Sequence, residues 1–185
     1  MHGVVFAELE RFVTRSHGAE QWRLILAQAE MTSQVFVAVG TYPDADLMKL
    51  VQSASSVTRV PVTQLLEGFG ESIAPTLFSM YRTVIAKEWR TLDLVENTER
   101  VIHTVVRSRG GTPPVLSTQR TDATHLVVTY GSQRKLCALA RGIIRGIAKH
   151  YHEQVLIVET ACMHTGAKNC RLELSMTANR PFKTA

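Results

Sequence analysis

The chain has 185 residues, of which 45% are hydrophobic and 20% charged, and it carries a formal net charge of +5. No apolar run reaches the ~18 residues that a transmembrane helix requires, which argues against an integral membrane protein. The opening MHGVVFAELERF sets acidic residues among apolar ones and lacks the basic start of a signal peptide. We therefore expect one cytoplasmic domain, residues 1–185, with no membrane partner.

Helices are predicted for the first two-thirds of the chain, because apolar residues recur there at intervals of three and four. The positions with this spacing are Val5, Leu9, Phe12, Val13, Trp22, Ile25, Leu26, Ala29, Leu47, Leu50 and Val51. Residues 61–85 keep the helical pattern, but Gly68, Gly70 and Pro75 favour breaks in it. A last helical stretch follows, and a Gly-Gly-Thr-Pro-Pro sequence ends it.

The last third of the chain predicts a small antiparallel sheet. Its short strands are VLSTQR, HLVVTYGS, VLIVETACM and CRLELSM. Between the second and third, residues 134–151 carry an apolar stripe at helical spacing, which predicts one helix that crosses the sheet. Helices followed by an antiparallel sheet make an α+β fold. We expect a helical N-terminal subdomain over roughly residues 1–60 and a sheet-bearing part over residues 61–185.

Two patterns carry candidate chemistry. His103 lies at the edge of an apolar helical stripe, so it is either a core-edge histidine bonded to a carbonyl or a metal ligand. In TYGSQR, side chains two apart in an extended chain point to one face, which would bring together Tyr130, Ser132 and Arg134. We call these three residues the clamp. A phenol, a hydroxyl and a guanidinium suit carboxylates, although a solvated strand edge would have the same pattern.

The order of these motifs resembles one family. VIHTVV with His103, then GGTPPVL, then YGSQR follow one another as in the haem nitric oxide/oxygen binding (H-NOX) domains, from Met1 to about residue 176. The resemblance implies haem b between the helical and sheet parts, with His103 as the iron ligand. It also implies that the clamp holds the haem propionates and that Pro114 belongs to the haem-binding residues.

The resemblance further implies which gas is bound. Oxygen-binding members place a tyrosine over the iron, and Leu139 holds the matching position here. The other distal positions that the resemblance implies are Leu9, Ile73, Val5 and Leu77. Because none of these side chains donates a hydrogen bond, we expect nitric oxide and carbon monoxide to bind without a stable oxygen complex. The alternative is that Tyr81 reaches the pocket from elsewhere.

A sensor of this kind would bind rather than catalyse. The resemblance implies that nitric oxide weakens the bond between iron and His103, so that the helix carrying His103 is released. A separate partner would respond, for which a sensor histidine kinase or a cyclic-di-GMP enzyme is expected. Arg141, Arg145 and Lys149 form a basic stripe that could dock an acidic partner. Without interleaved aromatic residues, that stripe does not predict nucleic-acid binding.

The three cysteines form a third pattern. Cys137 falls in the crossing helix, while Cys162 and Cys170 flank a turn between two strands, and an odd number cannot all pair. A zinc-containing subset of H-NOX proteins, which this chain resembles, has three cysteines in this arrangement and one histidine. The place of that histidine holds Glu159 here, and His164 could substitute as the fourth ligand. The alternative is three buried thiols with no metal.

Other function classes compete with a haem sensor. In a redox sensor built on the cysteines or their zinc, oxidation of the thiolates would carry the signal and haem would be secondary. A small-molecule sensor domain of the vinyl-reductase type has a similar sheet, but it lacks the combination of His103 and YGSQR. An enzyme is disfavoured, since the sequence shows no nucleophile–base pair and no paired carboxylates.

Overall fold

The computed structural model describes residues 1–177, in which helices come first and a four-stranded antiparallel sheet follows. The predicted α+β fold is therefore confirmed. The described residues group into two units. Unit 1 comprises Met1–Ala74 and Ala138–Ile143, and unit 2 comprises Pro75–Cys137 and the chain from Ile144 on. The boundary after Ala74 falls within one long helix.

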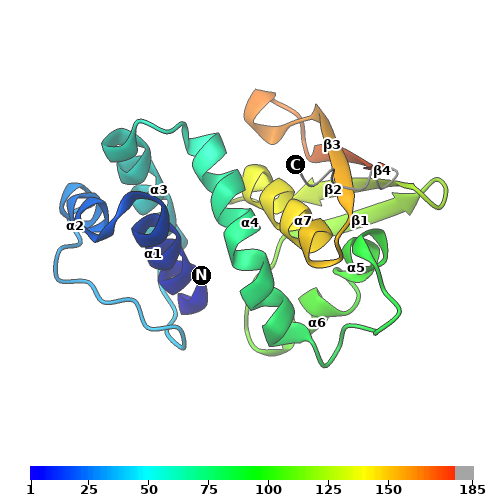
Figure 1. Cartoon of the computed structure of the whole chain (residues 1–185), viewed down its shortest axis with the longest axis horizontal. Coiled ribbons are helices and arrows are strands. Elements are labelled where there is room, and N and C mark those ends of the chain that lie inside the picture. Colours follow the sequence, from blue (N-terminus) through cyan, green and yellow to red (C-terminus); the bar gives the residue numbers. More distant parts are fainter. Residues whose placement is uncertain (178–185) are drawn as a thin grey trace, which may run out of the picture. The chain divides into compact units, whose positions relative to one another are not determined.

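Unit 1 is built from helices (Figure 1). They are α1 (Gly3–His17), α2 (Ala19–Gln28), α3 (Asp44–Thr58), the first part of α4 (Val62–Tyr81) and residues Ala138–Ile143 of a later helix. Each buries the apolar face that its spacing predicts, as Leu9 does on α1 and Leu50 on α3. The ring of Phe36 stacks on Phe6, with 4.8 Å between centroids, and holds the loop before α3 against α1.

Helix α4 is continuous where the sequence predicted breaks. All three predicted breakers lie inside it, so that prediction is wrong. Packing explains one of them. A Cβ atom on Gly70 would lie 2.3 Å from the carbonyl oxygen of Leu139, and one on Gly142 would lie 2.1 Å from the carbonyl oxygen of Glu67. These two glycines therefore let the backbone of α4 meet that of α7 (Cys137–His150).

Arg141 is shielded from solvent, against the prediction of a basic outer stripe. Only 11% of its side chain is exposed, and its Nη2 atom lies 2.7 Å from Oε1 of Glu67 on α4. The close approach of the two helices covers a position that helical spacing alone had placed outside. The predicted stripe is therefore wrong at its first member.

Unit 2 carries the antiparallel sheet, in the order β1-β2-β4-β3. The strands are β1 (Val115–Arg120), β2 (His125–Gly131), β3 (Gln154–Ala161) and β4 (Cys170–Thr177). Burial alternates with a period of two along both strands, between buried and half-buried side chains in most of β2 and between half-buried and exposed ones in β3. The register of β3 against β4 shifts between Glu159 and Ala161, and such a bulge bends the end of a strand.

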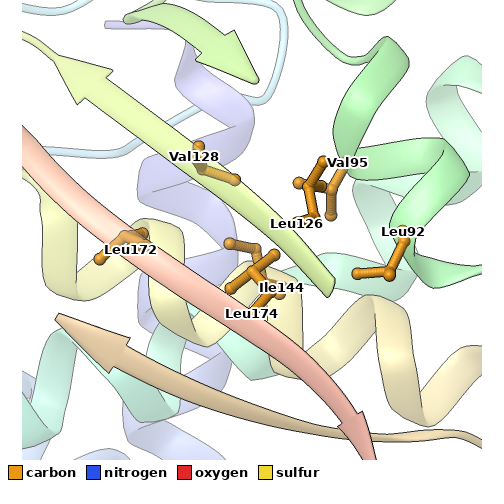
Figure 2. Close-up of a cluster of buried hydrophobic side chains, with 7 residues drawn as sticks. All are labelled: Leu92, Val95, Leu126, Val128, Ile144, Leu172 and Leu174. Carbon is orange, nitrogen blue, oxygen red and sulfur yellow. The ribbon is translucent and has the colours of Figure 1, made fainter. Parts of the chain in front are cut away.

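One face of the sheet packs against α5 (Thr91–Asn97) and α7. Figure 2 shows the buried side chains that meet there: Leu92, Val95, Leu126, Val128, Ile144, Leu172 and Leu174. Leu126 and Leu172 are fully buried, so trimming either to alanine would cost about 2–5 kcal/mol. This core fixes α5 to the sheet, and with it the start of the segment that leads into α6 (Ile102–Ser108).

Candidate functional site

His103 lies on the short helix α6, and only 9% of the residue is exposed. Its Nδ1 atom lies 2.8 Å from Oε2 of Glu99, four residues earlier in the chain. Burial lowers the pKa of His103, and the hydrogen bond with Glu99 opposes that effect in part. The ring is therefore neutral at pH 7, with Nδ1 donating its proton to the carboxylate. Nε2 is then the nitrogen that can coordinate a metal.

Glu99 has further partners. The backbone N–H of Leu116, at the start of β1, donates to Oε2 at 3.0 Å, and the guanidinium of Arg107 donates to Oε1. Burial by itself would raise the pKa of Glu99, but the hydrogen bonds from His103, Leu116 and Arg107 outweigh burial and lower it. Glu99 is therefore a charged acceptor that links the His103 ring to the sheet.

The clamp residues do not share one strand face as predicted. Strand β2 ends at Gly131, and a turn follows in which Ser132 Oγ accepts the backbone N–H of Arg134 at 3.2 Å. The hydroxyl of Tyr130, which is 3% exposed, hydrogen-bonds to the side chain of Ser132, while burial raises the pKa of Tyr130. The turn, rather than the pleat of a strand, connects the three residues.

Thr112 holds the guanidinium of Arg134. Nη1 of Arg134 donates to the carbonyl oxygen of Thr112 and Nη2 donates to its hydroxyl, each at 2.6 Å. Two residues later, the backbone of Pro114 lies near His103 and helps to raise the pKa of its ring. The Thr-Pro-Pro segment therefore touches both the histidine and the clamp, which places Pro114 beside His103.

The residues expected to line the gas side of the haem divide between the units. Leu9 and Ile73 are buried in unit 1, and Val5 and Leu139 are half-buried in the same unit. Leu77 lies in unit 2 and is also half-buried. All five side chains are apolar. The alternative donor, Tyr81, lies at the end of α4, and burial raises its pKa.

The three cysteines come together at the end of the sheet. Cys137 begins α7, Cys162 follows β3 and Cys170 begins β4. The Sγ atom of Cys162 lies 3.8 Å from that of Cys137 and 3.9 Å from that of Cys170, and all three are free thiols. A carboxylate oxygen of Glu159 completes a group whose four ligand atoms lie within 4.8 Å of one another. We call these four residues the cysteine cluster.

His164 lies outside the cysteine cluster. It falls in the 3-10 turn Met163–Thr165 rather than on the strand face expected for it, and its Nε2 atom lies 2.8 Å from the carbonyl oxygen of Lys135. Of the two candidates for a fourth zinc ligand, the structure brings Glu159 to the thiols. Burial raises the pKa of Cys137, so without a cation that thiol stays protonated.

Comparison with known proteins decides the family. The family profile described as Haem-NO-binding matches residues 2–159. The chain belongs to the haem-NO-binding, or H-NOX, family. A crystal structure of an H-NOX protein from S. oneidensis in the Fe(II)NO ligation state matches with a TM-score of 0.88 at 27% identity, covering 96% of this chain and 100% of that one. The Fe(II) unliganded H-NOX protein from K. algicida matches with the same TM-score at 22% identity, covering 99% and 100%.

A longer relative places the H-NOX chain in a wider context. Soluble guanylate cyclase gcy-35 of Caenorhabditis elegans is 20% identical over 167 residues, which are 86% of this chain and 24% of the cyclase. The chain therefore spans about a quarter of that relative. H-NOX domains are haem-based gas-sensor domains and not catalytic ones, so the prediction that this domain is no enzyme is confirmed. Within residues 1–177, no helix is long and apolar enough to cross a membrane.

The side chains of unit 2 fit a haem by their chemistry. A buried neutral imidazole is a usual iron ligand, and a guanidinium, a phenol and a hydroxyl are each donors that suit carboxylates. Sequence reasoning missed three residues of this arrangement: Glu99, Arg107 and Thr112. A signal existed for Glu99, which lies four residues before His103 at the spacing that lets two helical side chains meet. Nothing local indicated Thr112, whose partner Arg134 is 22 residues away.

Proposed function

We propose that this H-NOX domain is a nitric oxide sensor whose haem iron is ligated by Nε2 of His103. The observation that carries the proposal is the buried His103 ring, whose Nδ1 is held by a charged Glu99. A core histidine with a purely structural role could satisfy its ring N–H with a backbone carbonyl and would need no carboxylate at this distance. A metal-ligating imidazole commonly donates its second N–H to such a group. Bound haem b would supply the coordination position at which the gas binds.

The clamp is proposed to hold the haem propionates. Tyr130 is buried and hydrogen-bonded to Ser132, while Arg134 is already oriented by Thr112 through two short hydrogen bonds. A guanidinium fixed in this way loses little side-chain freedom when a carboxylate binds. The Thr-Pro-Pro segment, which contacts His103 as well, supports a shared role for Pro114 in the same site.

Selectivity for nitric oxide and carbon monoxide over oxygen is proposed to follow from the apolar distal residues. Bound dioxygen carries partial negative charge and is stabilised by a hydrogen-bond donor. Leu9, Ile73 and Leu139 offer none, and neither do Val5 and Leu77. We therefore expect the ferrous protein to bind nitric oxide and carbon monoxide while forming no lasting oxygen complex.

Absorption spectra of the ferrous protein test this proposal. The wild type should bind carbon monoxide and nitric oxide and show no stable oxygen complex in air. Leu139→Tyr should gain an oxygen complex, whereas Leu139→Phe, which has similar bulk and no hydroxyl, should not. A long-lived oxygen complex in the wild type would overturn the selectivity, and a protein that binds no haem would overturn the function.

The cysteine cluster is proposed to hold one zinc ion, with Glu159 as the fourth ligand. Three thiolates and a carboxylate are a suitable donor set for tetrahedral zinc. The support is the gathering of four ligand atoms within 4.8 Å, in which His164 takes no part. This cluster also favours a second function, a redox sensor in which oxidation of zinc-bound thiolates would release the metal. Protonated buried thiols without zinc would respond poorly, because the thiolate is the reactive form.

A separate protein is proposed to receive the signal. A sensor histidine kinase or a cyclic-di-GMP enzyme remains our expectation for that partner, and the cytoplasm for the location. Gas binding can shift a conformational equilibrium only by the difference in its affinity for the two states. The strength of the bond between His103 and iron is therefore the quantity that decides how much signal is transmitted.

A further inference from the structure

Glu99 is the only carboxylate among the described residues that is seen to contact His103, and it also contacts Arg107 on α6 and Leu116 on β1. It lies in the turn between α5 and α6. Its Oε2 atom accepts hydrogen bonds from Nδ1 of His103 at 2.8 Å and from the backbone N–H of Leu116 at 3.0 Å. Its Oε1 atom accepts a hydrogen bond from the guanidinium of Arg107. Both carboxylate oxygens are therefore engaged, by two side chains of α6 and by a backbone N–H of β1.

The contact with Leu116 extends the connection into the sheet. Leu116 on β1 stands opposite Tyr130 on β2 in the antiparallel register. Glu99 thus ties the proposed iron ligand to the strand position that pairs with the first residue of the clamp. A change in the orientation of the His103 ring would act on this backbone hydrogen bond through a single side chain.

Neighbouring carboxylates show what a purely structural contact looks like. Asp93 and Glu96 precede Glu99 at intervals of three residues, and both contact Arg120 on β1, at 2.8 Å and 2.9 Å. They fasten the same segment to the same strand, yet among the described residues neither is seen to contact His103. Glu96 therefore provides a matched control for the negative charge and for the attachment to β1.

The chemistry of a hydrogen bond to Nδ1 gives Glu99 a role that Glu96 does not have. A carboxylate that accepts the N–H of a metal-bound imidazole fixes the ring tautomer and orientation, and it makes the other nitrogen a stronger donor to the metal. Arg107 donates a hydrogen bond to Oε1 of the same carboxylate. Its positive charge reduces the negative charge that Glu99 presents to the histidine.

We propose that Glu99 is a positioning residue that strengthens His103 as the iron ligand and couples it to strand β1, and that Arg107 moderates this effect. The proposal rests on the ligation of haem by His103 that is proposed above. It concerns the regulation of that site, because a stronger bond between iron and His103 makes release of α6 on gas binding less favourable.

Resonance Raman spectra of the ferrous, ligand-free holoprotein test the proposal through the iron–histidine stretching band. Glu99→Gln keeps the size of the side chain and removes its charge, so the band should fall in frequency. Arg107→Gln leaves Glu99 in place with more of its charge directed at His103, so the band should rise. Glu96→Gln should leave it unchanged. Haem transfer to apomyoglobin should become about 10-fold faster in Glu99→Gln.

The opposite signs in the two variants separate the proposal from a structural role. A residue that only held the fold would shift the band in the same direction for Glu99→Gln and Arg107→Gln, or equally for Glu96→Gln, and either result would overturn the proposal. An unchanged band in Glu99→Gln would do so as well. If the wild type shows no iron–histidine band at all, the ligation by His103 is what fails.

Discussion

His103 and the cysteine cluster lie in the same unit, yet they offer a metal very different surroundings. His103 contributes one buried nitrogen, and its orientation comes from Glu99, Arg107 and Leu116. The cysteine cluster contributes four ligand atoms within 4.8 Å of one another. At His103, the surroundings of a metal would be set by the hydrogen bonds around a single ligand. In the cysteine cluster, they would be set by the four ligands themselves.

This difference matches what each site would have to do. A site that binds a gas must leave coordination positions open, so the protein can tune it only through one ligand and its hydrogen bonds. A structural zinc site is closed by four protein ligands, and its binding free energy becomes folding free energy. The cluster joins the start of α7 to β3 and β4, so a metal there would fasten the helix to the sheet.

Loss of the single ligand should have the largest effect. His103→Gly should abolish haem binding at normal haem concentrations, because no second protein ligand is proposed for the iron, and added imidazole should restore it. Haem content per chain, measured by absorbance after gel filtration, checks this. His152→Gly is the matched control, since His152 is exposed and has a φ of 55° that suits glycine. Normal haem content in His103→Gly without imidazole would contradict the assignment.

Loss of one ligand from the cysteine cluster should weaken zinc binding without abolishing it. We expect about one zinc per chain in reduced protein, by the chemistry of four-ligand sites. Glu159→Ala should weaken zinc binding and lower the free energy of unfolding by a few kcal/mol, out of the ~10–16 kcal/mol that structural zinc can supply. Elemental analysis and urea unfolding with and without a chelator check both effects.

His164→Ala is the control for this prediction, because its side chain contacts the carbonyl of Lys135 and lies outside the cluster. It should keep its zinc. Equal zinc loss in both variants, or loss only in His164→Ala, would remove Glu159 from the site. If the reduced wild-type protein contains no zinc, the cysteine cluster is a group of buried thiols and not a metal site.

The clamp should have an intermediate effect. Arg134→Ala removes charged hydrogen bonds from the proposed propionate site, each worth about 1.5–3 kcal/mol, so haem should be lost roughly 10- to 100-fold faster. Thr112→Val, which removes only one of the two groups that orient the guanidinium, should have a smaller effect in the same direction. Haem transfer to apomyoglobin measures both. Arg171→Ala, an exposed arginine on β4, should match the wild type.

The smallest effect concerns a carboxylate that belongs to neither metal site. Burial by itself would raise the pKa of Glu153, but hydrogen bonds from Thr91 and Arg90 outweigh it and lower the pKa. A lowered pKa means that the ionised group stabilises the fold above its ordinary value of 4.5, and that this contribution is lost as the pH falls through the folded value. Glu153→Gln should therefore cost on the order of 1 kcal/mol at pH 7.

Urea unfolding of the apoprotein at pH 7 and at progressively lower pH measures this difference. The gap between wild type and Glu153→Gln should narrow as the pH falls below 4.5. A gap that stays constant would mean that the charge of Glu153 contributes nothing. The same variant should leave haem and zinc content unchanged, which makes it a reference for effects of fold stability alone.

Local patterns in the sequence predicted the fold class and the order of helices and strands, and the order of its motifs indicated the family through a resemblance. Apolar spacing located α1, α2, α3 and α7, because the periods of 3.6 and 2.0 residues follow directly from backbone geometry. Local rules also predicted breaks in α4 and a fully extended clamp, and both predictions were wrong. The helix continues because its apolar face is buried, and β2 ends early because a turn at Ser132 takes over its hydrogen bonds.

The tertiary structure alone decided which partners the functional side chains have. Glu99 meets Leu116 across 17 residues, Arg134 meets Thr112 across 22, and Cys137 meets Cys162 across 25. The choice between Glu159 and His164 was open in the sequence, because either residue type binds zinc and both lie near Cys162. A bulge at the end of β3 and a 3-10 turn after it settled which side chain joins the thiols. Such contacts depend on how separate elements pack, which no local rule of spacing contains.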